Sequence, residues 1–150
     1  MKVIGLIENN YYIVQKSAKK FDVEFRVGEH SVSLDNFEYY ERMSEETNAF
    51  SADLVMNGEV VGDCSNSGRG GCADYHAYKN WDLAREIGTA VNEVEDFCFP
   101  QNRLSLADVI DQLATFILIL QDNKVTTITK AKALVNFLND EALKYRKMYS

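Results

Sequence analysis

Three side chains with metal-binding or nucleophilic chemistry lie within thirteen residues of one another. Cys64, Cys72 and His76 supply two thiols and an imidazole, the groups that zinc prefers in a tetrahedral site. The Cys-x-x-Cys spacing typical of structural zinc sites is missing, and the fourth ligand would have to be a carboxylate, His30 or Cys98. We therefore predict no metal and no cofactor, with a zinc site on Cys64, Cys72 and His76 as the least favoured alternative.

Two of these residues could also form a nucleophile and base pair. Cys72 and His76 are four residues apart, and residues 72–78 alternate as a strand does. On a strand that spacing separates the two side chains by about 13 Å, which is too far for proton transfer. The sequence thus predicts no catalytic residue and favours a protein that is not an enzyme.

A glycine loop, residues 66–71, gathers three glycines within four positions. Clustered backbone N–H groups can hold an anion, and Arg69 could add a bidentate contact to a phosphate. Neither of the two common nucleotide-binding glycine motifs is present, so a tight loop shaped by its backbone is the favoured interpretation. The alternative is a phosphate or nucleotide site formed by Ser67, Gly68, Arg69, Gly70 and Gly71.

An acidic-aromatic segment, residues 38–46, precedes that loop. The chain has a formal net charge of −7, with the acids concentrated in its middle and the last helix basic. Dense carboxylates repel nucleic acid and attract basic proteins, and exposed aromatic side chains are typical of protein-binding surfaces. A solubilising surface is the alternative explanation. The residues expected to contact a partner are Glu38, Tyr39, Tyr40, Glu41, Glu45 and Glu46, with Arg69 at the tip of the glycine loop.

Length and composition fit one domain over residues 1–150. The hydrophobic content is 46% and the charged content 26%, which are ordinary values for a folded globular protein. The longest apolar run, residues 113–120, is much shorter than the roughly 20 residues that cross a bilayer. Without a recognisable secretory signal, we expect a cytoplasmic protein with no membrane association and with reduced cysteines.

Strand patterns fill the first half of the chain. Apolar runs or alternation at 1–7, 11–15, 21–27, 31–34, 50–56, 60–61 and 72–78 predict an antiparallel sheet of about five to six strands. Asn57-Gly58 is the strongest hairpin signal, because both residues tolerate the positive φ of a type I′ turn. Residues 35–48 fit either a short helix or a long connection between strands.

Helical periodicity fills the second half. One helix is expected from an Asn80 N-cap through Cys98 to Pro100, and a second, central one from a capping box on Ser105 and Asp108. A third begins near Thr129. Strands over residues 1–78 followed by about three helices over 79–150 predict an α+β fold, with the sheet packed against the helices.

The run over residues 50–62, together with residues 66–71 and Tyr75, resembles small uncharacterised accessory proteins of phages and other mobile elements. The resemblance covers residues 50–75 only. It implies an accessory protein of the broad class that includes anti-CRISPR inhibitors of host defence, acting in the host cytosol. No functional residue is assigned by this resemblance.

Together these observations predict a non-enzymatic binding protein, encoded by a phage or mobile element. It is expected to dock on a basic host protein that handles nucleic acid, without itself contacting nucleic acid. A small-ligand module built on the glycine loop is the alternative, and a zinc-stabilised domain is less favoured. The oligomeric state is left open, with a homodimer among the alternatives.

Overall fold

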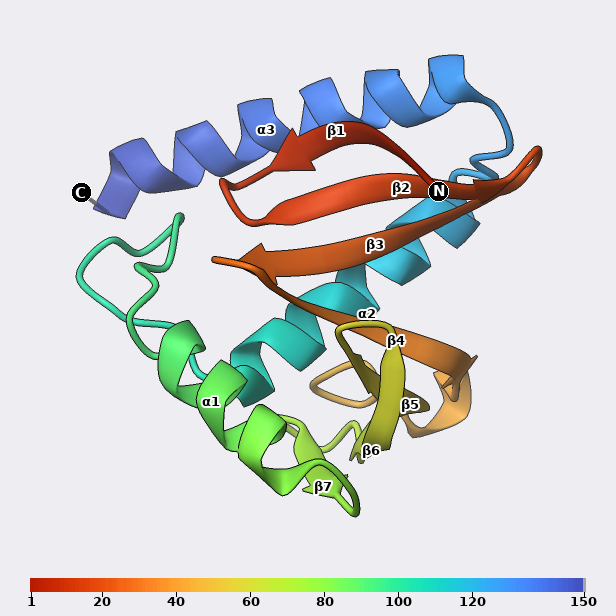
Figure 1. The fold of residues 1–150 in the computed structure, drawn as a ribbon. Helices are drawn as coiled ribbons and strands as arrows, with labels where there is room; N and C mark the ends of the chain where they lie inside the picture. The colour runs from red at the N-terminus through yellow and green to blue at the C-terminus, as the bar shows by residue number, and fades with distance from the viewer. Residues whose placement is uncertain (150) are drawn as a thin grey trace.

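The computed structural model describes residues 1–149, in which a seven-stranded antiparallel sheet is followed by three helices (Figure 1). This confirms the predicted α+β class. The strands are β1 (Lys2–Ile7), β2 (Tyr11–Ser17), β3 (Lys20–Val27), β4 (His30–Tyr39), β5 (Phe50–Met56), β6 (Glu59–Asn66) and β7 (Asp74–Ala77). Their order in the sheet is their order in the sequence, so each strand pairs with the one before it.

Alternation of side chains places the apolar face of the sheet as predicted. In β3, Val23 and Phe25 are fully buried. In β5, the buried residues are Phe50, Ala52, Leu54 and Met56, with the residues between them partly exposed. The β5–β6 turn has positive φ at both Asn57 (53°) and Gly58 (81°), as a type I′ turn requires.

Three helices cover this apolar face: α1 (Trp81–Val91), α2 (Leu106–Asp122) and α3 (Ile128–Tyr149). Helix α2 is the central one, because eight of its 17 residues are buried. It contacts β3 and β4, whereas α3 lies along β1 and α1 contacts β3 (Figure 1). None of the helices within residues 1–149 is both long and apolar enough to span a bilayer.

The second helix begins where its sequence predicts. The Ser105 hydroxyl accepts a hydrogen bond from the Asp108 N–H at 3.1 Å, and the Asp108 carboxylate accepts one from the Ser105 N–H at 2.9 Å. This reciprocal pair is the predicted capping box. Asn80 precedes α1 but does not cap it through its side chain. Its backbone has a left-handed conformation, and its side-chain amide donates to the Glu59 carboxylate instead.

The structure corrects two details of the predicted elements, the sheet and the first helix, and resolves one that was left open. The sheet has seven strands, because β6 and β7 both pair fully; the last strand is shorter than predicted and begins at Asp74. Residues 35–48 combine both alternatives, since β4 continues to Tyr39 and a short 3₁₀ helix, η1 (Glu41–Met43), follows. Helix α1 ends at Val91, well before Cys98.

The early end of α1 has a local cause. The Asp96 carboxylate accepts hydrogen bonds from the N–H groups of Cys98 and Phe99 at 3.0 and 3.3 Å. Such side-chain bonds favour a turn over a helix. A bridge between Glu95 and Arg103 then closes the connection to α2, so residues 92–105 form a loop despite their helical periodicity.

Candidate binding surface

The acidic-aromatic segment lies on the surface at the end of β4. Tyr39 and Tyr40 are 40% and 37% exposed, and Met43 is 53% exposed. The Tyr40 hydroxyl donates to the Glu38 carboxylate at 2.9 Å and lies 2.8 Å from the Ser51 hydroxyl on β5. The four glutamates of the segment are all exposed. All six predicted contact residues are therefore exposed, although Glu38 and Tyr39 are neighbours on β4 and point to opposite faces of the sheet.

The glycine loop holds the second half of this segment in place. The Gly68 carbonyl accepts hydrogen bonds from the N–H groups of Glu45 and Glu46, both at 2.9 Å, and from that of Thr47 at 3.3 Å. Gly68 has φ +84°, and a side chain there would collide with the Met43 carbonyl. The acidic-aromatic segment and the glycine loop are thus one structural unit.

Asn66 anchors that unit to the body of the protein. It is the only buried polar residue within residues 1–149, at 6% exposure. Its side-chain oxygen accepts from the Gly68 N–H (2.9 Å) and the Thr47 hydroxyl (2.8 Å), and its amide donates to Asp111 of α2 at 3.0 Å. The other Asp111 oxygen accepts from the Ala73 N–H at 2.9 Å. The sequence does not reveal this pair, because nothing local marks residues 45 positions apart as partners.

Burial raises the pKa of Asp111, although its bonds from Asn66 and Ala73 act in the opposite direction. A desolvated carboxylate is held only while its donors remain in place. Asp111 therefore requires its hydrogen bonds from Asn66 and Ala73 to stay buried as a carboxylate. The position of the glycine loop depends on the Asn66–Asp111 bond.

These contacts oppose the phosphate or nucleotide alternative. The Gly68 N–H, which an anion would need, already donates to Asn66. The Glu46 carboxylate lies beside Gly70, where it would repel a phosphate. Ser67 and Arg69 are exposed at the tip of the loop. One arginine beside a carboxylate offers an anion little net attraction.

The geometry of the sheet opposes the zinc alternative. Cys64 pairs with Tyr75 on β7 and is buried, whereas the next pair, Asp63 and His76, faces the opposite side of the sheet. Burial, followed by the charge of Asp63, raises the pKa of the Cys64 thiol to about 12, so the thiol stays protonated. Within residues 1–149 no three His, Cys, Asp or Glu side chains come together as a metal site requires.

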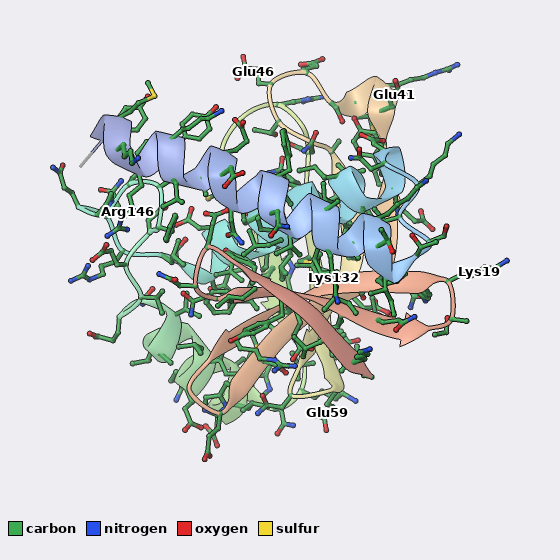
Figure 2. The ribbon with its side chains drawn as sticks, turned by 90° about the horizontal axis from the view of Figure 1, so that it is seen from above. Lys19, Glu41, Glu46, Glu59, Lys132 and Arg146 are labelled. Carbon is green, nitrogen blue, oxygen red and sulfur yellow. The ribbon has the colours of Figure 1, made fainter. Side chains whose placement is uncertain are left out.

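Glu59, another acid from the middle of the chain, does not lie beside the acidic-aromatic segment. Figure 2 shows Glu41 and Glu46 on one side of the molecule and Glu59 on the opposite side. Arg146, on the basic last helix, lies away from both groups in that view and pairs with Glu95 at 3.2 Å. The acids of the middle of the chain therefore do not form one continuous negative surface.

A second acidic region, the acidic cleft, was not predicted. This cavity of about 220 Å³ lies between the β1–β2 turn, the 92–105 loop and the first half of α2. Its lining includes Glu8, Tyr11, Glu95, Asp96, Phe97, Leu104, Asp108 and Asp111. The spacing of Asp108 and Asp111 on α2 was a usable signal, but only the fold brings Glu8 and Asp96 to the same place.

Glu8 has an unfavourable environment in this cleft. Burial raises the pKa of Glu8 above its usual 4.5; the thiol of Cys98, 3.5 Å away, lowers it, and the charge of Asp96 adds to the rise. Burial and the neighbouring Glu8 charge also raise the pKa of the Cys98 thiol to about 12. The thiol therefore remains a hydrogen-bond donor to Glu8.

We expect Glu8→Gln to stabilise the protein at neutral pH. A carboxyl whose pKa is raised by folding holds more protons in the folded state than in the unfolded state, so its contribution to stability falls as pH rises through that range. The variant removes this loss and keeps an oxygen acceptor for Cys98, and its melting temperature should exceed that of the wild type by about 2 °C at about pH 7. Thermal melts across pH should show the difference shrinking as the pH falls towards 4.5, the usual pKa of Glu8, and disappearing below it. A difference that is independent of pH would contradict this explanation.

The fold and these contacts define an α+β protein with a seven-stranded meander and an exposed acidic-aromatic segment that is hydrogen-bonded to the glycine loop. Comparison of the chain with protein-family models, with curated proteins and with solved structures finds no match.

Proposed function

We propose that this chain is a non-enzymatic binding protein that docks through its acidic-aromatic segment on a basic protein surface. The observation that carries the proposal is that Tyr39, Tyr40 and Met43 stand exposed among four glutamates on a segment fixed from behind by the glycine loop. Aromatic side chains and methionine are enriched at protein interfaces, and a preorganised segment loses little entropy on binding.

The charge of the segment favours a basic partner. Glu41, Glu45 and Glu46 make no side-chain hydrogen bond or ion pair within residues 1–149, so their charge is available to a partner. Arg42 is the one base among residues 38–46. Opposite charges across an interface accelerate association and select the partner, whereas nucleic acid would be repelled.

The biological setting proposed is that of a phage or mobile-element accessory protein. The support for it is the resemblance of residues 50–75 to such proteins. An acidic surface of this kind could compete with nucleic acid for a basic groove of a host defence protein, as an anti-CRISPR inhibitor would. The partner would then be a host protein that handles nucleic acid, met in the host cytosol.

Charge reversal tests the proposal. A protein captured from host lysate is purified, and its affinity is measured for the wild type and for the variant Glu38→Lys, Glu41→Lys, Glu45→Lys and Glu46→Lys. We expect binding to weaken about a hundredfold at low salt and to lose most of its salt dependence. Nucleic acid should compete with the wild-type protein for the partner.

A matched control separates this surface from net charge alone. The control variant reverses four exposed acids elsewhere: Glu29, Glu93, Asp122 and Asp140. It carries the same net charge as the test variant and should bind about as tightly as the wild type. Equal losses in the two variants, or no loss in either, would show that the acidic-aromatic segment is not the binding surface.

A further inference from the structure

The acidic cleft contains a polar group that the fold does not use. The Tyr11 ring is only 3% exposed and is packed edge-on by Phe25 and Phe116, with ring centroids 5.2 Å away in each case. Its position on β2, beside the β1–β2 turn, brings the phenol to the wall of the cleft. The ring is therefore rigid, and its hydroxyl has a defined position.

No group within residues 1–149 forms a hydrogen bond with the Tyr11 hydroxyl. No buried side-chain nitrogen or oxygen in that part of the chain is sealed away without a partner, so the hydroxyl must open into the cleft. Burial and the charges of Glu8, Asp96 and Asp108 hold the pKa of Tyr11 well above its usual range. The hydroxyl thus keeps its proton and faces the carboxylates.

Three carboxylates of the cleft, unlike the Tyr11 hydroxyl, form hydrogen bonds within the fold. Asp96 holds the turn at Cys98, Asp108 caps α2 and Asp111 holds Asn66. The fold explains the positions of these three carboxylates, whereas the Tyr11 hydroxyl has no hydrogen-bond partner within residues 1–149 and faces the cavity. Tyr11 is the observation that points to a ligand.

Charge and size restrict what that ligand can be. The cleft is lined by five carboxylates, from Glu8, Glu95, Asp96, Asp108 and Asp111, and by no lysine or arginine. Arg146 reaches Glu95 and the Phe97 carbonyl, and its charge offsets one of the five. An anion would be repelled. A single metal ion is also disfavoured, because no three acidic, His or Cys side chains within residues 1–149 converge on one point.

We propose that the acidic cleft binds the primary ammonium group of an extended amine, with the Tyr11 hydroxyl as one acceptor. An ammonium carries three N–H donors, which suits acceptors that surround a cavity without converging. Its alkyl chain can lie against Leu104, while one face of the Phe97 ring is covered by the Arg146 guanidinium, 5.0 Å from the ring centroid. The volume of about 220 Å³ accommodates one such chain. This site shares no residue with the acidic-aromatic segment, so it stands or falls separately from the function proposed above.

The same ammonium chemistry occurs in free polyamines and in the lysine side chains of proteins. Isothermal titration at constant ionic strength, with 1,4-diaminobutane and with N-acetyl-lysine methylamide as probes, distinguishes these sources. Saturable binding of the diamine alone identifies a polyamine site, and binding of the lysine derivative identifies a site for a protein lysine. Tetramethylammonium, which has charge but no N–H donor, should not bind.

Two isosteric variants make the test specific. Tyr11→Phe removes only the hydroxyl and keeps the ring that Phe25 and Phe116 contact, so we expect it to fold and to bind the preferred probe about tenfold more weakly. Tyr12→Phe removes the neighbouring hydroxyl, which does not line the cleft, and should bind like the wild type. Thermal melts confirm that both variants are folded.

Three results would overturn the proposal: no saturable binding of either amine, equal binding by Tyr11→Phe and the wild type, or equal binding of tetramethylammonium. Titration with calcium chloride covers the inorganic alternative. Calcium binding that Tyr11→Phe weakens, without amine binding, would show that the cleft takes a metal ion instead.

Discussion

Replacing Gly68 with alanine is expected to lower the free energy of unfolding by about 3 kcal/mol. The loss has two causes: an alanine side chain is strained in a left-handed backbone conformation, and its methyl group clashes with a neighbouring segment. Gly68 has φ +84°, and the new methyl group would overlap the Met43 carbonyl and press on Ala49. The clash is with backbone, which cannot rotate away. Thermal denaturation should show a decrease of about 10 °C in melting temperature.

A second glycine of the same loop is the matched control. Gly71 also has a positive φ, +86°, but a methyl group there meets nothing within 4 Å. Gly71→Ala should therefore cost only the conformational strain, about 1 kcal/mol. If both variants lose the same stability, the contact between the glycine loop and the acidic-aromatic segment does not hold that segment in place.

The Gly68 variant also connects the fold to the proposed function. Displacing Gly68 breaks the bonds from Glu45 and Glu46 to its carbonyl, so the acidic-aromatic segment loses its fixed shape while keeping every charge. Partner affinity should fall even at temperatures where Gly68→Ala remains folded. Unchanged affinity would show that charge alone, without preorganisation, accounts for binding.

Replacing Asn66 with aspartate is expected to cost about 3 kcal/mol or more, because it places a second carboxylate against Asp111 in a buried site. The Asn66 amide lies 3.0 Å from the Asp111 oxygen, and its replacement leaves two acceptors facing each other without a donor. Thermal melts at neutral pH should show the loss. Lowering the pH should restore part of it, since protonation of one carboxyl supplies the missing donor.

Exchanging the two side chains provides the internal rescue. In the double variant Asn66→Asp and Asp111→Asn, the amide now carried by α2 can donate to the new carboxylate on β6 and accept from the Ala73 N–H. That carboxylate can still accept from Thr47 and Gly68. We expect the double variant to recover most of the lost stability. Losses that simply add would show that the two side chains do not act as a pair.

Most of the fold was predictable because its signals are local. Alternation in residues 21–27 and 50–56 marks strands whose inner side chains are buried, and Asn57-Gly58 forms the turn that its backbone preferences favour. Ser105 and Asp108 begin α2 by bonding each other. Each of these features depends on residues within a few positions of one another.

The errors arise where one local preference competes with another. Helical periodicity over residues 81–98 continues past Val91, but the Asp96 side chain bonds the N–H groups that a helix would use. The strand at residues 72–78 loses its first two residues because the Ala73 N–H bonds Asp111 instead of β6. Asp96 acts within its own turn, whereas Asp111 acts from α2.

Residue types and spacing alone determined the α+β class, the hairpin and the presence of an exposed acidic-aromatic segment, because each follows from interactions between near neighbours in the chain. Tertiary structure determined which distant segments these elements contact. It made the glycine loop a clamp for the acidic segment through Gly68 and Asn66, separated Cys64 from His76, and collected carboxylates from three segments around Tyr11. The physical reason is that these contacts join residues far apart in sequence, whose meeting depends on how the sheet packs on α2.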